Sequence, residues 1–124
     1  MQLIFIDTKN RRTQRMAYNS RLAERIRKVL TGMPALTEKK MFGGIAFMLN
    51  GNMACGVSGD DLMVRVGPEG HAAAMVLPHV RPFDLTGKPM AGWVLVGPEG
   101  TASEADLRAW VDKGVTYAAS LPAK

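Results

Sequence analysis

The sequence is poor in cysteine and in long apolar runs, and both shortages narrow the class of protein. Cys55 is the single cysteine, so no disulfide can form within the chain. No apolar run approaches the roughly 18 residues that cross a bilayer, and no charged segment followed by an apolar one and a small-residue cleavage site opens the chain. We therefore expect a cytoplasmic protein that makes no contact with a membrane.

Aromatic residues are also few, at 6% of the chain, but hydrophobic residues make up 47% and charged residues 22%. These proportions are usual for a soluble folded domain and exclude a disordered or collagen-like chain. A length of 124 residues suits one compact domain that buries roughly two-thirds of its unfolded surface. We place this domain over residues 18–124, with residues 1–17 as an N-terminal extension.

The extension begins with an apolar run, Leu3–Ile6, and continues as a polar stretch to Arg15. Met16 is an alternative start, in which case the preceding residues are not native. A strand-compatible apolar segment left in water is an aggregation hazard, so it should pair with a sheet edge. We predict a symmetric homodimer in which the segment docks on its own domain or on a second copy. The alternative is a monomer with a disordered extension.

Positive charge is concentrated in the first third of the chain. Residues 1–40 hold ten lysines and arginines against three acidic residues, whereas residues 41–124 hold six against eight. Such an excess attracts nucleic acid through phosphate contacts, but a solvated helix face produces the same count, and we regard that reading as the more ordinary one. The residues that would bind nucleic acid are Arg21, Arg25, Lys28, Lys39 and Lys40.

Helical spacing follows Ser20, which suits an N-cap, and ends before Gly32 and Pro34. A junction motif, Val64–Gly70, is echoed almost unchanged by Val94–Gly100, and each copy closes a strand and opens a helix. The first copy leads to a short helix over residues 72–77, and the second leads to a long helix with a capping box formed by Ser103 and Asp106. The apolar stripes comprise Leu22, Ile26, Val29 and Leu30 in the first helix, and Leu107, Trp110, Val111, Gly114 and Ala118 in the last.

Turn residues separate the strands. Asn50-Gly51 supplies the positive φ angles that a tight hairpin needs, and alternating apolar residues follow the next turn at residues 58–61. The expected strands span residues 45–49, 53–57, 62–66, 81–83 and 93–96. The sequence therefore predicts an α+β fold of two layers, in which helices lie on one face of an antiparallel sheet in the order α-β-β-β-α-β-β-α.

No recognisable set of catalytic or metal-binding residues is present. Cys55, His71 and His79 are separated by 16 and 8 residues, which matches no compact zinc pattern. Gly43-Gly44 lacks the Gly-Lys-Ser/Thr ending of a phosphate loop and is more typical of a bulge or a close backbone approach. We expect a buried Cys55, no metal, no cofactor and no enzymatic activity, with a thiol enzyme using Cys55 as the alternative.

Nine methionines are present, several of them in expected strands. Flexible methionines usually fill gaps in a core, but they also form adaptable surfaces for protein partners. Core packing is the favoured explanation of these methionines, and a partner-binding surface is the alternative. Because no catalytic set is present, we expect the protein to act through contacts with a partner protein of unknown identity. The candidate contact residues beside the basic ones are Phe42, Gly43, Gly44 and Met48.

The run Lys-Met-Phe-Gly-Gly at residues 40–44, followed by the hairpin and then by Asp61–Val66, resembles the N-terminal domain of the TfoX/Sxy family. The resemblance covers about Tyr18 to Ala119. It implies a fold similar to secretion-chaperone-like domains and supplies no catalytic residues. Full-length members regulate DNA-uptake competence and carry a second, C-terminal domain. The resemblance thus favours a regulatory or adaptor module, with nucleic-acid binding by the basic helix as the alternative.

Overall fold

The computed structural model describes residues 18–41, 43–83 and 90–124. Its helices are α2 (Ser20–Val29), α3 (His71–Met75) and α4 (Glu104–Ala119), and a 3-10 helix, η1 (Pro98–Thr101), precedes α4. Its strands are β1 (Leu36–Met41), β2 (Gly44–Leu49), β3 (Asn52–Ser58), β4 (Asp61–Arg65), β5 (Val80–Pro82) and β6 (Trp93–Val96). No helix in these residues is both long enough and apolar enough to cross a membrane.

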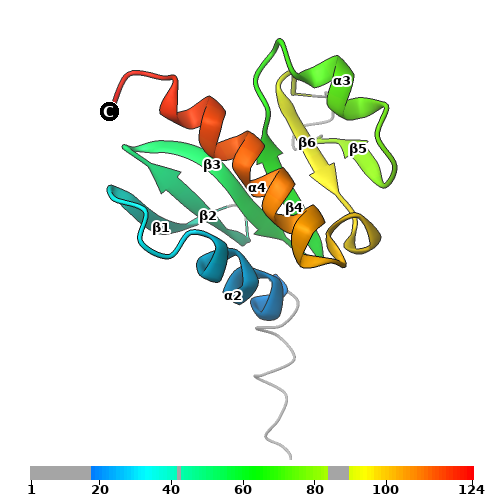
Figure 1. The fold of residues 1–124 in the computed structure, drawn as a ribbon, viewed down its shortest axis with the longest axis horizontal. Helices are drawn as coiled ribbons and strands as arrows, with labels where there is room; N and C mark the ends of the chain where they lie inside the picture. Colours follow the sequence, from blue (N-terminus) through cyan, green and yellow to red (C-terminus); the bar gives the residue numbers. More distant parts are fainter. Residues whose placement is uncertain (1–17, 42, 84–89) are drawn as a thin grey trace, which may run out of the picture.

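The strands form one antiparallel sheet in the order β1-β2-β3-β4-β6-β5. Figure 1 shows α2 and α4 lying across the same face of this sheet, with α3 beside β6. The predicted α+β fold, with helices on one face of an antiparallel sheet, is therefore confirmed. The hairpin between β2 and β3 turns at Asn50 and Gly51, whose φ angles of 54° and 83° are the positive values that the Asn-Gly dipeptide predicts.

The prediction of three strands between the first two helices is wrong, because β1 adds a fourth. Its sequence is mainly polar, and four of its six residues are exposed. The strand lies at the edge of the sheet and pairs only with β2, with Lys39 opposite Ala46. An exposed edge strand has no buried apolar face, so it leaves no alternating signal in the sequence.

The ends of the helices follow capping chemistry. Asn19, rather than the predicted Ser20, is the N-cap of α2, and its side-chain oxygen accepts hydrogen bonds from the backbone N–H groups of Arg21 and Leu22 at 2.9 and 3.1 Å. At α4 the predicted cap is present, since the Ser103 hydroxyl accepts from the Asp106 N–H at 3.0 Å. The two copies of the junction motif, Val64–Gly70 and Val94–Gly100, end differently. The first ends in a turn before α3, and the second ends within η1 before α4.

The apolar core lies between the sheet and the helices. The stripes predicted for α2 and α4 point into it, with Ile26, Leu107 and Val111 fully buried. A second, methionine-rich cluster lies on the opposite face of the sheet around Met63, which is 1% exposed. Met48 belongs to the half-buried margin of this second cluster.

Candidate functional site: a groove between α3 and α4

A groove of about 930 Å³ lies on the helix-covered side of the sheet, between α3 and α4. This volume lies at the upper end of the range for binding sites in proteins. One wall is made by Val66–Gly70, Ala73, Ala74 and Leu77, which lead into α3 and out of it. The other wall is one face of α4, formed by Ala109, Asp112, Lys113, Thr116, Tyr117 and Ser120.

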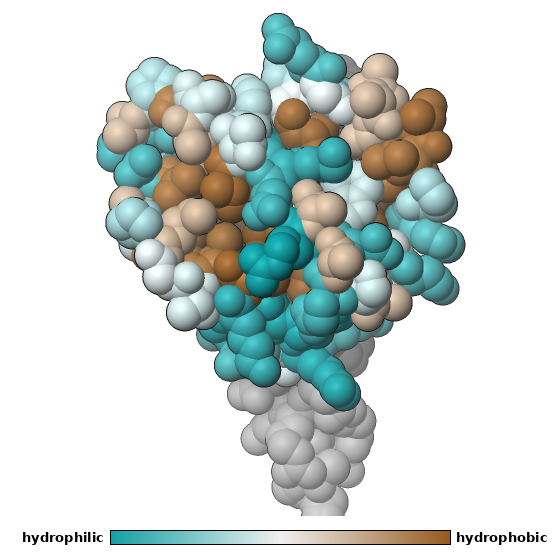
Figure 2. All heavy atoms as spheres, in the orientation of Figure 1, coloured by the Kyte–Doolittle hydropathy of each residue, from teal (hydrophilic) through white to brown (hydrophobic). Residues whose placement is uncertain are grey.

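The mouth of the groove exposes apolar surface. Leu77 is 41% exposed at its rim, and the adjacent Val76 is 83% exposed. No other large hydrophobic side chain in the described part of the chain is as open to solvent. Figure 2 shows hydrophobic side chains gathered around α3, at the right of the view, whereas hydrophilic side chains cover α2.

The floor of the groove depends on close packing at Gly67. This residue has a φ angle of +84°, and a Cβ added to it would come within 2.5 Å of the Tyr117 ring. On the other side of the site, the Arg65 guanidinium lies 5.2 Å from the Trp93 ring centroid and 5.4 Å from that of Tyr117. Cation–π contacts of this kind hold Tyr117 in place at the end of the groove.

A histidine holds α3 against the sheet. Nδ1 of His71 accepts a hydrogen bond from the backbone N–H of Gly92 at 3.1 Å, just before β6 begins. This contact requires a ring whose Nδ1 carries no proton. His71 is thus a structural residue that positions one wall of the groove.

Charge at the groove is mainly acidic. Glu69 stands on the α3 wall and Asp112 on the α4 wall. Neither carboxylate forms an ion pair with a cation of the described residues. The one basic lining residue, Lys113, has its ammonium 5.8 Å from the Trp110 ring centroid, so that cation is already engaged in a contact outside the groove.

The basic residues predicted to bind nucleic acid are divided between α2 and β1. Arg25 donates a hydrogen bond to the carbonyl of Thr101 at 2.7 Å and lies 3.4 Å from Glu104, so it ties α2 to the start of α4. On β1, Lys40 pairs with the core-facing Ile45, whereas Lys39 pairs with Ala46 on the opposite face of the sheet. Arg21 and Lys28 are exposed on α2.

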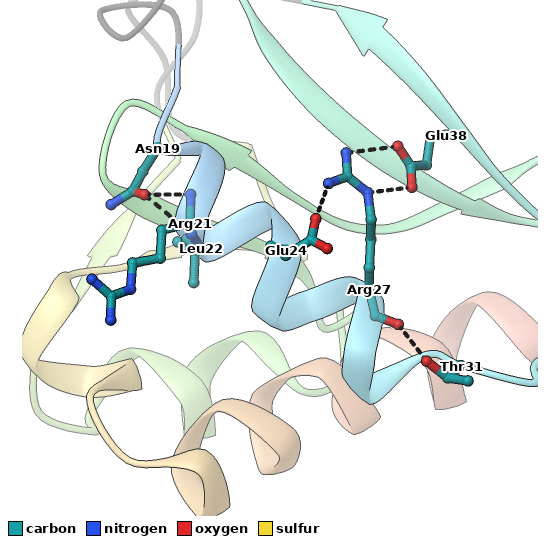
Figure 3. Close-up of polar contacts among 7 residues, drawn as sticks. All are labelled: Asn19, Arg21, Leu22, Glu24, Arg27, Thr31 and Glu38. Atoms are coloured by element: carbon teal, nitrogen blue, oxygen red, sulfur yellow. Dashed lines mark hydrogen bonds and ion pairs between the residues drawn. The ribbon is translucent and has the colours of Figure 1, made fainter.

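A further arginine on α2 is bound on two sides by carboxylates (Figure 3). Arg27 donates two hydrogen bonds to Glu38 on β1, at 2.7 and 3.0 Å, and one to Glu24 at 2.7 Å. The paired hydrogen bonds lower the pKa of Glu38 below its usual value. This part of the basic helix therefore carries little free positive charge.

The predicted contact residues around β2 lie on different surfaces. Gly44 is buried, and a Cβ there would overlap the carbonyl oxygen of Val57, which is the close backbone approach expected of the glycine pair. Gly43 is exposed with a φ of 73°, and Met48 is half-buried on the face away from the helices. Phe42 lies outside the described residues.

Cys55 is fully buried within the core, and burial raises the pKa of its thiol to about 12. A nucleophilic thiol requires a lowered pKa and access to solvent, and Cys55 has neither. Within residues 18–41, 43–83 and 90–124, no three His, Cys, Asp or Glu side chains are placed to hold a metal ion.

The groove was not among the predicted sites. Its members lie in two segments about forty positions apart in the chain, at residues 66–77 and 109–120. One local feature of the sequence points to the groove. Val76 and Leu77 follow a helix that is too short to bury both side chains.

One antiparallel sheet with helices on one face, a buried thiol and an open groove characterise this small α+β domain. The family model of the TfoX N-terminal domain matches residues 28–118, so the chain belongs to that family and is a module of the kind found in competence regulators. The family is not known for enzymatic activity. The chain matches no curated protein and no solved structure, and the likeness to secretion-chaperone-like domains stays an expectation.

Proposed function

We propose that the domain is a regulatory or adaptor module without enzymatic activity, and that it acts by binding a segment of another protein in the groove between α3 and α4. The observation that carries the proposal is the exposed apolar rim of that groove. Large apolar side chains that stay open to solvent beside a concave surface are typical of protein-binding sites. Leu77 supplies that rim.

Nucleic-acid binding by the N-terminal helix is the weaker candidate. Duplex or single-stranded nucleic acid needs several cations on one surface, because affinity comes from the number of phosphates neutralised together. Arg25 is bound to Thr101 and Glu104 instead, and Lys39 and Lys40 lie on opposite faces of β1. These contacts support protein binding over nucleic-acid binding.

The proposal is tested by capturing proteins from cytosol with the full chain and with two matched variants of α4. Ala109→Arg places a long side chain in the groove, whereas Ala105→Arg adds the same side chain one turn earlier, at an exposed position outside it. We expect a defined partner that is retained by the unaltered chain and by Ala105→Arg, and lost with Ala109→Arg.

A third variant, Met48→Glu, tests the contact surface predicted from the sequence on the opposite face of the sheet. If Met48→Glu abolishes capture and Ala109→Arg does not, the partner binds that face and the groove assignment is wrong. If both α4 variants capture the same proteins as the unaltered chain and no partner depends on either surface, the proposal fails.

A further inference from the structure

We infer that the segment bound in the groove is an amphipathic helix of about three turns that carries a lysine or arginine near its middle. The inference rests on the proposed function and adds to it the conformation, length and charge of the partner segment. Four features of the groove support the inference. They are the spacing of residues along its α4 wall, the hydrogen-bonded state of the neighbouring strands, the small side chains on both walls and the negative charge of its carboxylates.

The α4 wall sets the length. Its lining residues recur at positions 109, 112–113, 116–117 and 120, which is the spacing of one helix face. At a rise of 1.5 Å per residue, this face extends about 16 Å, or three turns. A helix laid alongside α4 needs the same length to fill the groove.

The backbone around the groove disfavours a partner that binds by strand addition. A strand binds by adding to a free sheet edge, but β6 is already paired on both sides, with β4 and β5. The N–H groups of Val66 and Gly67 both donate to the carbonyl of Gly92. Among the described residues, no free strand edge lines the groove, so strand addition is not available to a partner there. A helix satisfies its own backbone hydrogen bonds and matches the helical spacing of the α4 wall.

Small residues on both walls allow a third helix to approach closely. Ala73 and Ala109 are exposed on the opposing helices, with Gly70 at the start of α3 and Ser120 just after α4. Packed helix axes lie 8–10 Å apart depending on the side chains between them, and small side chains permit the shorter distance. Leu77 then packs against the apolar face of the incoming helix.

The charge of the groove selects the polar residue of that helix. Asp112 lies one turn from Ala109 and one turn from Thr116, near the middle of the α4 wall, and Glu69 is on the other wall. Lys113 is directed to Trp110. A cation near the middle of the bound helix meets these two carboxylates, whereas an anion there is repelled.

The test uses a displayed library of random 16-residue peptides selected on the full chain. Peptides that still bind Leu77→Asp are removed, and Val76→Asp serves as the matched control because Val76 is exposed but does not line the groove. A parallel selection uses the charge-reversed double variant Glu69→Lys with Asp112→Lys. Thermal melting confirms that each variant is folded before selection.

We expect Leu77-dependent peptides with apolar residues at helical spacing and a central lysine or arginine. Replacing that residue with glutamate should weaken binding to the unaltered chain by about tenfold and strengthen binding to the charge-reversed variant. Proline-rich or alternating sequences, or no Leu77-dependent enrichment at all, would overturn the helical occupant. Helical peptides with no preference for charge would overturn the cation. Either result leaves the capture experiment to decide separately whether the groove binds a protein.

Discussion

Gly114 of α4 lies directly over the backbone carbonyl of Ala54 in β3, so close that a Cβ on Gly114 would overlap the carbonyl oxygen. The glycine thus sets the distance between the last helix and the centre of the sheet. Glycine is unfavourable inside a helix by about 1 kcal/mol relative to alanine. Its presence here means that close packing outweighs helix propensity.

The first prediction is that Gly114→Ala destabilises the protein despite improving helix propensity. Overpacking against backbone atoms costs about 1–3 kcal/mol, because the sheet cannot move aside as a flexible side chain can. Urea unfolding should show a lower midpoint with an unchanged slope. Arg108→Ala, at an exposed position on the same helix, is the control and should stay within about 0.5 kcal/mol of the unaltered chain. Equal or greater stability for Gly114→Ala would show that the helix can shift.

The second prediction concerns Cys55. Because the thiol is fully buried, with a pKa raised to about 12, a thiol reagent at pH 8 should modify it only through opening of the domain. Labelling should be slow in buffer and complete, at one thiol per chain, in denaturant. Fast stoichiometric labelling of the folded chain would contradict this prediction and would favour the alternative of an enzyme that uses Cys55.

The same burial predicts a dependence of stability on alkaline pH. A group whose pKa is higher in the folded state than in the unfolded state stabilises the fold at low pH and loses that contribution as pH rises. For Cys55 the loss begins near the unfolded value of about 8.5 and continues toward the folded value of about 12. The fall in unfolding free energy above about pH 8.5 should be smaller in Cys55→Ala than in the unaltered chain.

The third prediction uses the Arg27–Glu38 ion pair. The hydrogen bonds from Arg27 lower the pKa of Glu38 in the folded state, so its contribution is present above the unfolded value and lost as pH falls below it. Both side chains are over a third exposed, at 36% and 37%, so the pair should contribute no more than about 1 kcal/mol. Glu38→Gln should therefore reduce stability at pH 7, and the difference from the unaltered chain should shrink as pH falls through the lowered pKa of Glu38. Glu24→Gln, which removes the charge of a carboxylate that accepts one hydrogen bond from Arg27 instead of two, should have a smaller effect.

The fourth prediction concerns His71 and Gly92. His71→Ala leaves the buried N–H of Gly92 without its acceptor, which costs about 1–3 kcal/mol. His71→Asn places an oxygen near the position of Nδ1 and should retain most of the stability. Hydrogen exchange of the Gly92 amide is the direct measurement. Exchange should be fast in His71→Ala and slow in the unaltered chain and in His71→Asn. Slow exchange in all three would mean that the hydrogen bond from Gly92 to His71 does not hold α3 in place.

The fifth prediction concerns oligomeric state. Direct edge-to-edge pairing of two described domains is disfavoured, since two β1 strands would bring Lys39 and Lys40 of both copies together, and β5 is only three residues long and ends in Pro82. The dimer predicted from Leu3–Ile6 should therefore depend on those residues. Sedimentation should give a dimer for the full chain and a monomer for a chain that begins at Met16. If both chains are monomeric at high concentration, the homodimer is contradicted. If both chains are dimeric, the interface lies on the domain.

Much of the fold could be read from neighbouring residues in the sequence. The Asn50-Gly51 turn, the Ser103 cap and the stripe through Leu107 and Val111 are confirmed because turn chemistry and helical periodicity depend on residues a few positions apart. The strand β1 could not be read this way, since its polar residues carry no periodic signal. The first N-cap was misplaced by one residue because asparagine and serine are both good caps.

The family, the α+β class and the burial of Cys55 could be inferred from the residues alone, since they depend on motif residues, local periodicity and a lone apolar-flanked thiol. The contacts of Arg25 with Thr101 and Glu104, and the groove between α3 and α4, are visible only in the folded domain. The physical reason is distance along the chain. Charge neutralisation and concave surfaces arise where segments many tens of residues apart are packed together, and no local pattern records which segments will meet.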